Sequence, residues 1–318
     1  MTSRTSPVPR YRAGTSPMAS NVYLRPMILC SPIKKIERAR PLLGTTASIR
    51  VECVDEALAH RAIDAAFAAM ARVHTLMSFH EVGSDLSRVH AAAPGERVVV
   101  DAQTAEVLRE ALQLSERSDG AFDITIADQL VSRGLLPAPK SQTMPNTAAS
   151  WRDIAVDDSH GVHLRRPLWI DLGGIAKGFA VDRAIEALRA NGISHACVNA
   201  GGDLRTLGQG PHLIAIATDE WQPSHYPVLE LGEASVASSS GRAFAATGAG
   251  PHLDGRHRTS IGLAQSVTVV AEHCIHADAL TKVVMAMGTH SADLLRHFNA
   301  VAYLQDATGH WLAIGNTA

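Results

Sequence analysis

The sequence predicts an α+β protein with mixed or antiparallel sheets and flanking helices. Segments with the pattern of strands and segments with helical periodicity occur along the whole chain, but they do not alternate strictly. Strict alternation is expected of a parallel α/β fold, so its absence favours α+β. The chain has 318 residues, of which 46% are hydrophobic, and this is enough for a large core in one or two domains. The sequence shows no internal repeat.

The first 38 residues predict a disordered basic tail, and residues 39–318 predict one folded domain. The tail is rich in Ser, Pro and Arg and lacks the apolar segment of a signal peptide. We therefore expect a cytoplasmic protein, while a periplasmic or membrane-associated location stays open. We expect no membrane span because no apolar run approaches about 18 residues. The formal net charge of −2 gives no electrostatic reason to expect nucleic-acid binding.

The first half of the chain predicts a strand, two long helices and two loops. Ser84 is the expected N-cap of a short helical turn at the end of the first loop, and Asp119-Gly120 is expected to end the second helix. The segments are, in order, a strand at 42–54, an amphipathic helix at 55–76, a polar loop at 77–88, a helix at 101–118 and a proline-containing loop at 134–150.

The stretch 168–208 predicts the central unit of the fold. It reads as an apolar strand at 168–172, a Gly173-Gly174 turn, a helix ending at Asn191-Gly192, and a second strand at 195–200. Glycines at such a turn let a ligand approach the backbone, and the N–H groups of the following helix can bind a phosphate. Lys177, one turn inside that helix, adds a positive charge.

Known phosphate motifs do not account for this stretch. A P-loop requires Ser or Thr after the lysine, but Gly178 follows Lys177, and the spacing of a dinucleotide fingerprint is missing. A purely structural β-α-β unit with a solvated Lys177 is the plain alternative. The position of Lys177 after the paired glycines favours a phosphate partner for this lysine. Asp203, after the second glycine turn, is not assigned to the chemistry.

The second half predicts further strands and one helix that carries a charged pair. Asp278 lies near the start of that helix, and Lys282 lies four residues later on the same face, which is also the spacing of an ordinary surface ion pair. The stretch 235–250 is too rich in Ser and Gly for the core of a helix. The expected elements are strands at 213–218, 228–231 and 266–271, a helix at 276–287 ended by Gly288, and a hairpin of strands 301–304 and 311–314.

Several of these stretches together resemble the ApbE family of FAD:protein FMN transferases. Each match is weak alone, but the order of the three longest blocks is specific, and the matches span about 42–288. The matching blocks are Leu43-Gly44-Thr45, Met77-Ser78 with Ser84 and Ser87, Gly120 to Thr125, Asp171 to Gly178, Asn199 to Asp203, Ser240-Gly241, His252-Leu253-Asp254 and Ala277 to Thr281.

The resemblance implies a phosphoryl transfer with FAD as substrate. Members of the family use Mg²⁺ and move FMN from FAD to a threonine hydroxyl of an acceptor protein, releasing AMP. The implied partner is therefore a flavoprotein that carries a threonine flavinylation motif. Such a reaction needs neutralised charge, an aligned hydroxyl and a stabilised leaving phosphate, and Mg²⁺ prefers oxygen ligands in near-octahedral geometry.

The resemblance also assigns roles to residues. His252 matches the base that takes the proton from the acceptor threonine, a role that suits an imidazole. Asp278, the Gly174 carbonyl and Thr281 are the expected metal ligands, and Asp278 and Lys282 join His252 as catalytic residues. The expected flavin-binding positions are Leu43, Phe79, Ala121, Phe122, Asp123, Asp171, Lys177 and Leu253.

The sequence departs from the family pattern at the metal. The family has Thr four residues after the aspartate, but here Lys282 stands there and Thr281 comes one residue early, about 100° around the helix. Either the Lys282 ammonium takes over part of the metal's work, or Mg²⁺ binds more weakly through the remaining ligands.

Three functions remain open at this point. The first is the FMN transferase, the second a metal-dependent FAD pyrophosphatase that uses water as acceptor, and the third a non-catalytic FAD-binding protein with a degenerate metal site. A zinc site of His252, His257, His273 and His276 is not expected, because their spacing fits no closed four-ligand set.

Overall fold

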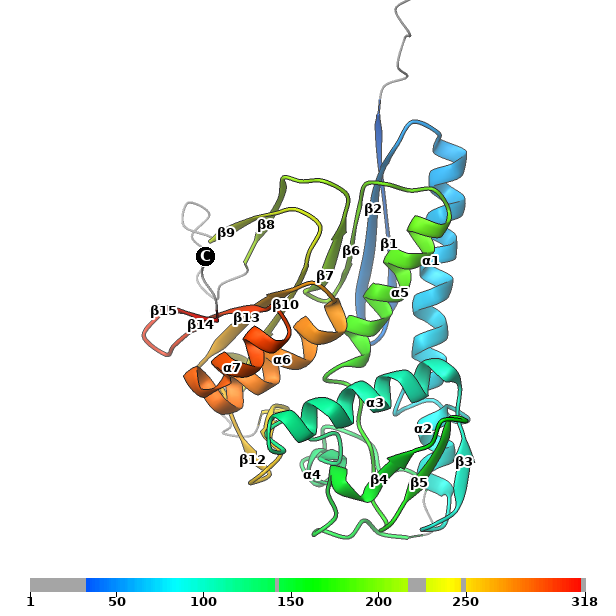
Figure 1. Cartoon of the computed structure of the whole chain (residues 1–318), viewed down its shortest axis with the longest axis vertical. Coiled ribbons are helices and arrows are strands. Elements are labelled where there is room, and N and C mark those ends of the chain that lie inside the picture. Colours follow the sequence, from blue (N-terminus) through cyan, green and yellow to red (C-terminus); the bar gives the residue numbers. More distant parts are fainter. Residues whose placement is uncertain (1–32, 141–142, 217–226, 247–249, 316–318) are drawn as a thin grey trace, which may run out of the picture. The chain divides into compact units, whose positions relative to one another are not determined.

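The computed structural model describes residues 33–140, 143–216, 227–246 and 250–315 (Figure 1). In these residues the main feature is an eight-stranded sheet in which every neighbouring pair is antiparallel. Its strands, in spatial order, are β1 (Lys34–Leu42), β2 (Thr45–Cys53), β6 (Ala196–Ala200), β7 (Asp203–Leu207), β10 (Ser235–Ser240), β13 (Ser266–Ala271), β14 (Val301–Gln305) and β15 (Trp311–Gly315).

Helices pack along this sheet in the order α1, α5, α6 and α7, and α1 contacts α5 as α5 contacts α6 (Figure 1). The α-helices of the described residues are α1 (Glu56–Met77), α2 (Asp85–Ala91), α3 (Ala102–Arg117), α4 (Ala127–Ser132), α5 (Ala176–Ala190), α6 (Cys274–Met287) and α7 (Ala292–His297). Short 3₁₀ turns lie at Trp151–Asp153, Arg242–Phe244 and Gly288–Ser291. None of the described helices combines the length and apolar composition needed to cross a bilayer.

Three small antiparallel sheets complete the fold of the described residues. The strands are β3 (Arg97–Val99), β5 (Gly161–Leu164) and β4 (Ile154–Val156) in one sheet, β8 (His212–Ala215) and β9 (Val228–Leu231) in the second, and β11 (Leu253–Asp254) and β12 (Thr259–Ser260) in the third. The predicted α+β class with antiparallel sheets and flanking helices is therefore confirmed.

Most predicted caps and turns are in place. The Ser84 hydroxyl accepts the Ser87 N–H at the start of α2, and the Asp101 carboxylate accepts the Gln103 N–H at the start of α3. Gly288 ends α6 with a positive φ of 56°. The C-terminal hairpin is confirmed as β14 and β15. Helix α6 begins at Cys274, two residues before the expected start.

Two N-terminal boundaries were wrong. Strand β1 begins at Lys34 and pairs with β2 along its whole length, so residues 34–38 belong to the sheet and not to a tail. Residues 1–32 lie outside the described part of the chain. The single strand predicted at 42–54 is the second strand of a hairpin, because Leu43 and Gly44 turn the chain with φ of 57° and 70°. Two consecutive positive φ values are typical of a tight hairpin turn.

The predicted strand at 168–172 does not form. The segment is buried, but the Ile170 N–H donates to Nε2 of His90 and the Asp171 N–H donates to the Ile124 carbonyl, so neither joins a sheet. A short apolar run indicates that a segment is buried, but it does not distinguish a strand from a buried extended segment. The β-α-β interpretation of 168–200 is therefore wrong.

A strand was missed at 235–240. Strand β10 lies in the middle of the large sheet, between β7 and β13, and helix α6 packs against it. Small side chains suit this position because the helix lies over them. Their hydroxyls are satisfied by the helix and by neighbouring backbone, as Ser239 Oγ lies 2.7 Å from Thr281 Oγ1 and Ser235 Oγ donates to the Glu272 carbonyl. Strand β8 covers only 213–215 of the predicted strand 213–218, and 217–218 lie outside the described residues.

His90 makes the fold sensitive to acid. Its side chain is 4% exposed, and burial lowers its pKa from 6.5 to about 4, so the folded protein holds a neutral imidazole. Between these values the unfolded chain binds the extra proton, so stability falls as pH falls from 6.5 towards 4. The free energy of unfolding of the wild type should fall between pH 7 and pH 5. In His90→Gln we expect this fall to be smaller by about 2 kcal/mol.

Urea denaturation at the two pH values measures this difference. His310→Gln, which removes an imidazole whose side chain is 87% exposed, is the control and should follow the wild type. Equal pH dependence of His90→Gln and wild type would contradict the buried neutral state.

Candidate active site

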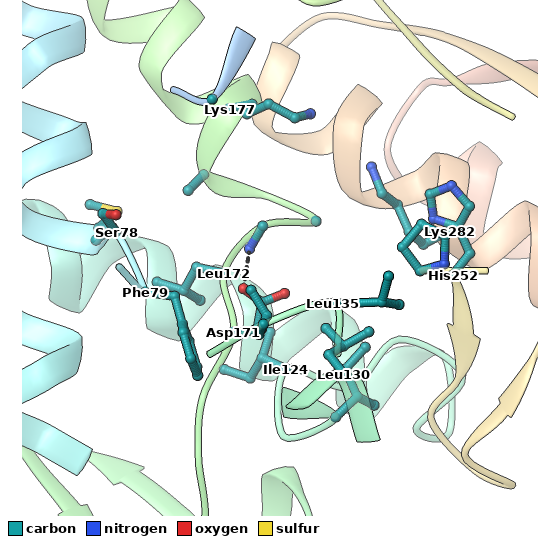
Figure 2. Close-up of a pocket in the computed structure, with 18 of the residues that line it drawn as sticks. Ser78, Phe79, Ile124, Leu130, Leu135, Asp171, Leu172, Lys177, His252 and Lys282 are labelled. Carbon is teal, nitrogen blue, oxygen red and sulfur yellow. Dashed lines mark hydrogen bonds between the residues drawn. The ribbon is translucent and has the colours of Figure 1, made fainter. Parts of the chain in front are cut away.

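A cavity of about 400 Å³ collects the residues that the sequence singles out (Figure 2). All eight expected flavin positions line it, together with Gly174, His252 and Lys282. They come from the β1–β2 turn, the loop after α1, the loop after α3, the segment before α5, the start of α5, strand β11 with the residue before it, and α6. Two predicted residues, Asp278 and Thr281, lie outside the lining and are fully buried.

One wall of the cavity is apolar. Phe79 packs against His90 with ring centroids 5.2 Å apart, and His90 in turn accepts the Ile170 N–H next to Asp171. Sequence reasoning missed most of this wall, because apolar residues of a loop and a short helix carry no spacing signal. The lining residues to which it assigned no flavin-binding role include Val73, Met77, Ile124, Ile126, Leu130, Leu135, Leu136 and Leu172.

Two carboxylates at the cavity are held by local backbone. Asp123 accepts the N–H and the hydroxyl of Thr125, both at 2.8 Å, and burial raises its pKa. Asp171 accepts the Gly173 N–H at 3.1 Å, and burial raises its pKa as well. Both acids are therefore positioned by the turn residues that follow them.

A chain of four alternating charges lies at the inner end of the site. Lys177 pairs with Asp203, its Nζ lies 3.6 Å from Asp278 Oδ2, and Lys282 pairs with Asp278 Oδ1. The order Asp203, Lys177, Asp278, Lys282 places each charge beside opposite ones. Sequence reasoning left Asp203 aside, although its carboxylate is the direct partner of Lys177.

Burial and the neighbouring charges shift the pKa values of Asp203, Lys177 and Asp278 in this cluster. Burial and the neighbouring Asp278 raise the pKa of Asp203 to about 6. Burial lowers the pKa of Lys177, but Asp278 and Asp203 outweigh it and raise the value overall. Burial raises the pKa of Asp278, but Lys177 and Lys282 reverse the effect and lower it. Near neutral pH Lys177 is therefore an ammonium group, and Asp203 and Asp278 are carboxylates.

A buried carboxylate on α5 fixes the helix that carries Asp278. Asp182 accepts the N–H groups of Cys274 and Ile275 at 3.0 and 2.9 Å, and it pairs with Arg205 at 2.6 Å. It supplies the acceptor that the N-terminus of α6 needs, because His273 makes no side-chain cap there. Sequence reasoning missed this residue, whose only signal is an acid on the apolar face of the helix.

The expected Mg²⁺ ligands do not fit together. Asp278 uses Oδ1 for Lys282, and its Oδ2 accepts the Gly178 N–H and lies near Lys177. The Thr281 hydroxyl donates to the Asp278 carbonyl and contacts Ser239, away from the cavity. Within the described residues no group of three His, Cys, Asp or Glu side chains is arranged to hold a metal. In this structure the Thr281 hydroxyl is therefore not placed beside the cavity as a ligand, and no step is assigned to a metal.

His252 faces the cavity as a neutral imidazole. Burial, reinforced by the charge of Lys282, lowers its pKa from 6.5 to about 4. Figure 2 shows His252 and Lys282 on the same side of the cavity, with Phe79 and Ser78 on the other. A neutral imidazole can accept a proton from a hydroxyl at physiological pH, as the predicted role of His252 requires.

Gly178 lets α5 and α6 approach each other at the charged cluster. A Cβ at this position would lie 2.2 Å from the Cys274 carbonyl oxygen and 2.9 Å from Asp278 Cβ. Gly→Ala inside a helix normally stabilises, but we expect Gly178→Ala to lower the free energy of unfolding by about 3 kcal/mol because the helices must separate. Urea denaturation measures this. Gly232→Ala, where a Cβ meets open space, is the control and should be neutral.

Comparison with known proteins places this site in a family. The model of the ApbE family matches residues 43–304, which is most of the chain. A FAD:protein FMN transferase of Vibrio cholerae is 27% identical over 86% of this chain and 87% of its own length, and one of Haemophilus influenzae is 28% identical over 73% and 74%.

Solved structures agree on the fold. The ApbE protein of Thermotoga maritima superposes with a TM-score of 0.75 at 25% identity, covering 89% of this chain and 98% of its own. The flavinyl transferase ApbE of Pseudomonas stutzeri gives a TM-score of 0.75 at 22% identity, covering 89% and 95%. The family model covers all residues that line the cavity, from Leu43 to Lys282. The chain belongs to the ApbE family.

Proposed function

We propose that this protein transfers the FMN half of FAD to a threonine hydroxyl of an acceptor flavoprotein and releases AMP. The observation that carries the proposal is the convergence of all eight expected flavin positions, a neutral imidazole and two ammonium groups on one cavity. The curated relatives are FAD:protein FMN transferases, and they match this chain over most of its length.

The cavity has two chemically different parts that suit the two parts of the substrate. The apolar wall around Phe79, Leu130 and Leu135 provides the contact that a flavin ring needs. Gly173, Gly174 and Lys177 also line the cavity, where the α5 N-terminus and the lysines favour a pyrophosphate. A volume of about 400 Å³ falls within the range of small-molecule sites.

The transfer needs one proton acceptor and one aligned hydroxyl. The threonine oxygen attacks the phosphorus on the riboflavin side, the bond from that phosphorus to the bridging oxygen breaks, and AMP leaves with the bridging oxygen. His252 accepts the hydroxyl proton, because its imidazole is neutral near pH 7. Mg²⁺ is left out of this proposal because the predicted ligand set is not assembled.

The experiment is mass spectrometry of a threonine peptide that carries the flavinylation motif, incubated with FAD and the purified protein. We expect the peptide to gain the mass of FMN and one AMP to be released for each adduct. His252→Asn should lower the adduct rate on the order of 100-fold while FAD still binds. Conversion of FAD to FMN and AMP without an adduct would instead indicate a pyrophosphatase, and intact bound FAD a non-catalytic flavin protein.

A further inference from the structure

Lys282 places an ammonium group inside the cavity. Its side chain is 15% exposed and lines the cavity, and its Nζ contacts both the Asp278 carboxylate and, at 3.0 Å, the Asp278 carbonyl. Burying this long side chain costs conformational entropy, which the two contacts with Asp278 offset. The amino group is therefore held at one end of the cavity by Asp278 and does not extend into solvent.

The stem of Lys282 lies beside Gly174, and its tip reaches Asp278. A Cβ built on Gly174 would be 3.6 Å from Lys282 Cε and 3.9 Å from its Cδ, so the lysine packs against the glycine. The same side chain reaches Asp278 Oδ1 at its tip. A cation bound at Asp278 Oδ1 would have to displace the lysine from that oxygen.

The charges of the cluster also oppose binding of a divalent cation at Asp278. Two ammonium groups already contact Asp278, one from α5 and one from its own helix. A divalent cation at Asp278 would stand beside both of them, and like charges at such distances repel strongly in a buried site. An anionic pyrophosphate in the cavity would instead meet Lys177 and Lys282, which line it, whereas Asp203 and Asp278 do not.

We propose that the Lys282 ammonium replaces the divalent cation, so that this protein transfers FMN without a metal; this inference rests on the proposed function. As the bond from phosphorus to the bridging oxygen breaks, the leaving AMP phosphate gains a negative charge. Lys282 stabilises that charge, and Asp278 orients Lys282. The phosphodiester product keeps one charge, and the proton of the threonine hydroxyl goes to His252. A fixed ammonium acts as a point charge on phosphate oxygens.

Replacing Lys282 by threonine distinguishes catalysis by the lysine ammonium from catalysis by a bound metal ion. Lys282→Thr removes the ammonium, opens the space beside Gly174 and adds a hydroxyl next to Asp278. After chelation with EDTA, wild type should form the FMN adduct at a rate that excess Mg²⁺ changes less than about threefold. Lys282→Thr should lose on the order of 100-fold in EDTA and recover with Mg²⁺. Lys282→Met, which keeps the stem without the charge, should stay inactive in both conditions.

Metal binding gives a readout independent of turnover. Calorimetric titration with Mn²⁺ in the presence of FAD should show no stoichiometric site in wild type and one site in Lys282→Thr. Cooperative unfolding and FAD affinity, measured by flavin fluorescence, confirm that each variant is folded. Lys34→Met, which removes an exposed lysine paired with Glu56, is the matched control and should match wild type in every assay.

The outcomes separate the two proposals. An adduct that wild type forms only with Mg²⁺, together with a stoichiometric Mn²⁺ site, overturns the replacement of the metal by Lys282 and leaves the transferase intact. No adduct from wild type with or without metal overturns the transferase and, with it, the metal-free transfer. Metal-free transfer by wild type with Mg²⁺ rescue of Lys282→Thr supports both.

Discussion

Asp278→Asn should lower the rate of FMN transfer on the order of 100-fold or more while the protein still binds FAD. The carboxylate of Asp278 is fully buried and holds Lys282 through Oδ1 while facing Lys177 and the Gly178 N–H through Oδ2. An amide has one oxygen instead of two and carries no charge, so it cannot orient both ammonium groups. A loss of this size is typical when one preorganised electrostatic group is removed.

The expected change is specific to the reaction because Asp278 does not line the cavity. Adduct formation by mass spectrometry measures the rate, and flavin fluorescence measures the affinity for FAD. Asp293→Asn is the matched control, since it makes the same change on α7 at a side chain that is 89% exposed, and it should leave both values unchanged. An unchanged transfer rate in Asp278→Asn would remove this residue from the mechanism.

The parts of the site that the sequence predicts well depend on short blocks in which residue type and backbone conformation are linked. Asp171 followed by Gly173 is an example, because the carboxylate accepts the glycine N–H directly. Leu43 is another, since it sits in a hairpin turn that brings it to the cavity. These relations act over two or three residues, so the order of the blocks was sufficient to identify them.

The parts that could not be predicted depend on partners far apart in the sequence. Asp203 lies 26 residues from Lys177, and Asp182 lies 92 residues from the Cys274 N–H that it accepts. Neither spacing matches a helical or strand period, so only the folded chain pairs them. The prediction of a strand at 168–172 failed for a related reason. The backbone hydrogen bonds of this segment go to His90 and Ile124, which no periodicity identifies.

Long-range pairing also determines the surroundings of Asp278, the carboxylate expected to bind Mg²⁺. Helical spacing places Asp278 and Lys282 on one face, but it does not say whether that face is solvated or buried. The structure buries Asp278 completely and adds Lys177 from a second helix. That third member turns a common surface spacing into a buried cluster in which two ammonium groups lie beside one carboxylate.

Lys177→Met should destabilise the fold more than the loss of any exposed lysine. Without the ammonium, Asp203 and Asp278 face each other as buried like charges, and breaking a buried ion pair typically costs about 3–5 kcal/mol. We expect a decrease of that size in the free energy of unfolding at pH 8, measured by urea denaturation. Lys34→Met, whose lysine is half exposed, should cost less than about 1 kcal/mol.

The destabilisation of Lys177→Met should shrink as the pH falls. The pKa of Asp203 is already raised to about 6 by burial and Asp278, and removing Lys177 raises it further. A carboxyl with a raised pKa binds a proton more readily in the folded state than in the unfolded state, so acid stabilises the variant relative to wild type. Adding Asp203→Asn removes the repulsion at every pH, and the double variant should therefore regain most of the lost stability. A double variant no more stable than Lys177→Met would show that the cost comes from lost packing of the lysine stem and not from the two carboxylates.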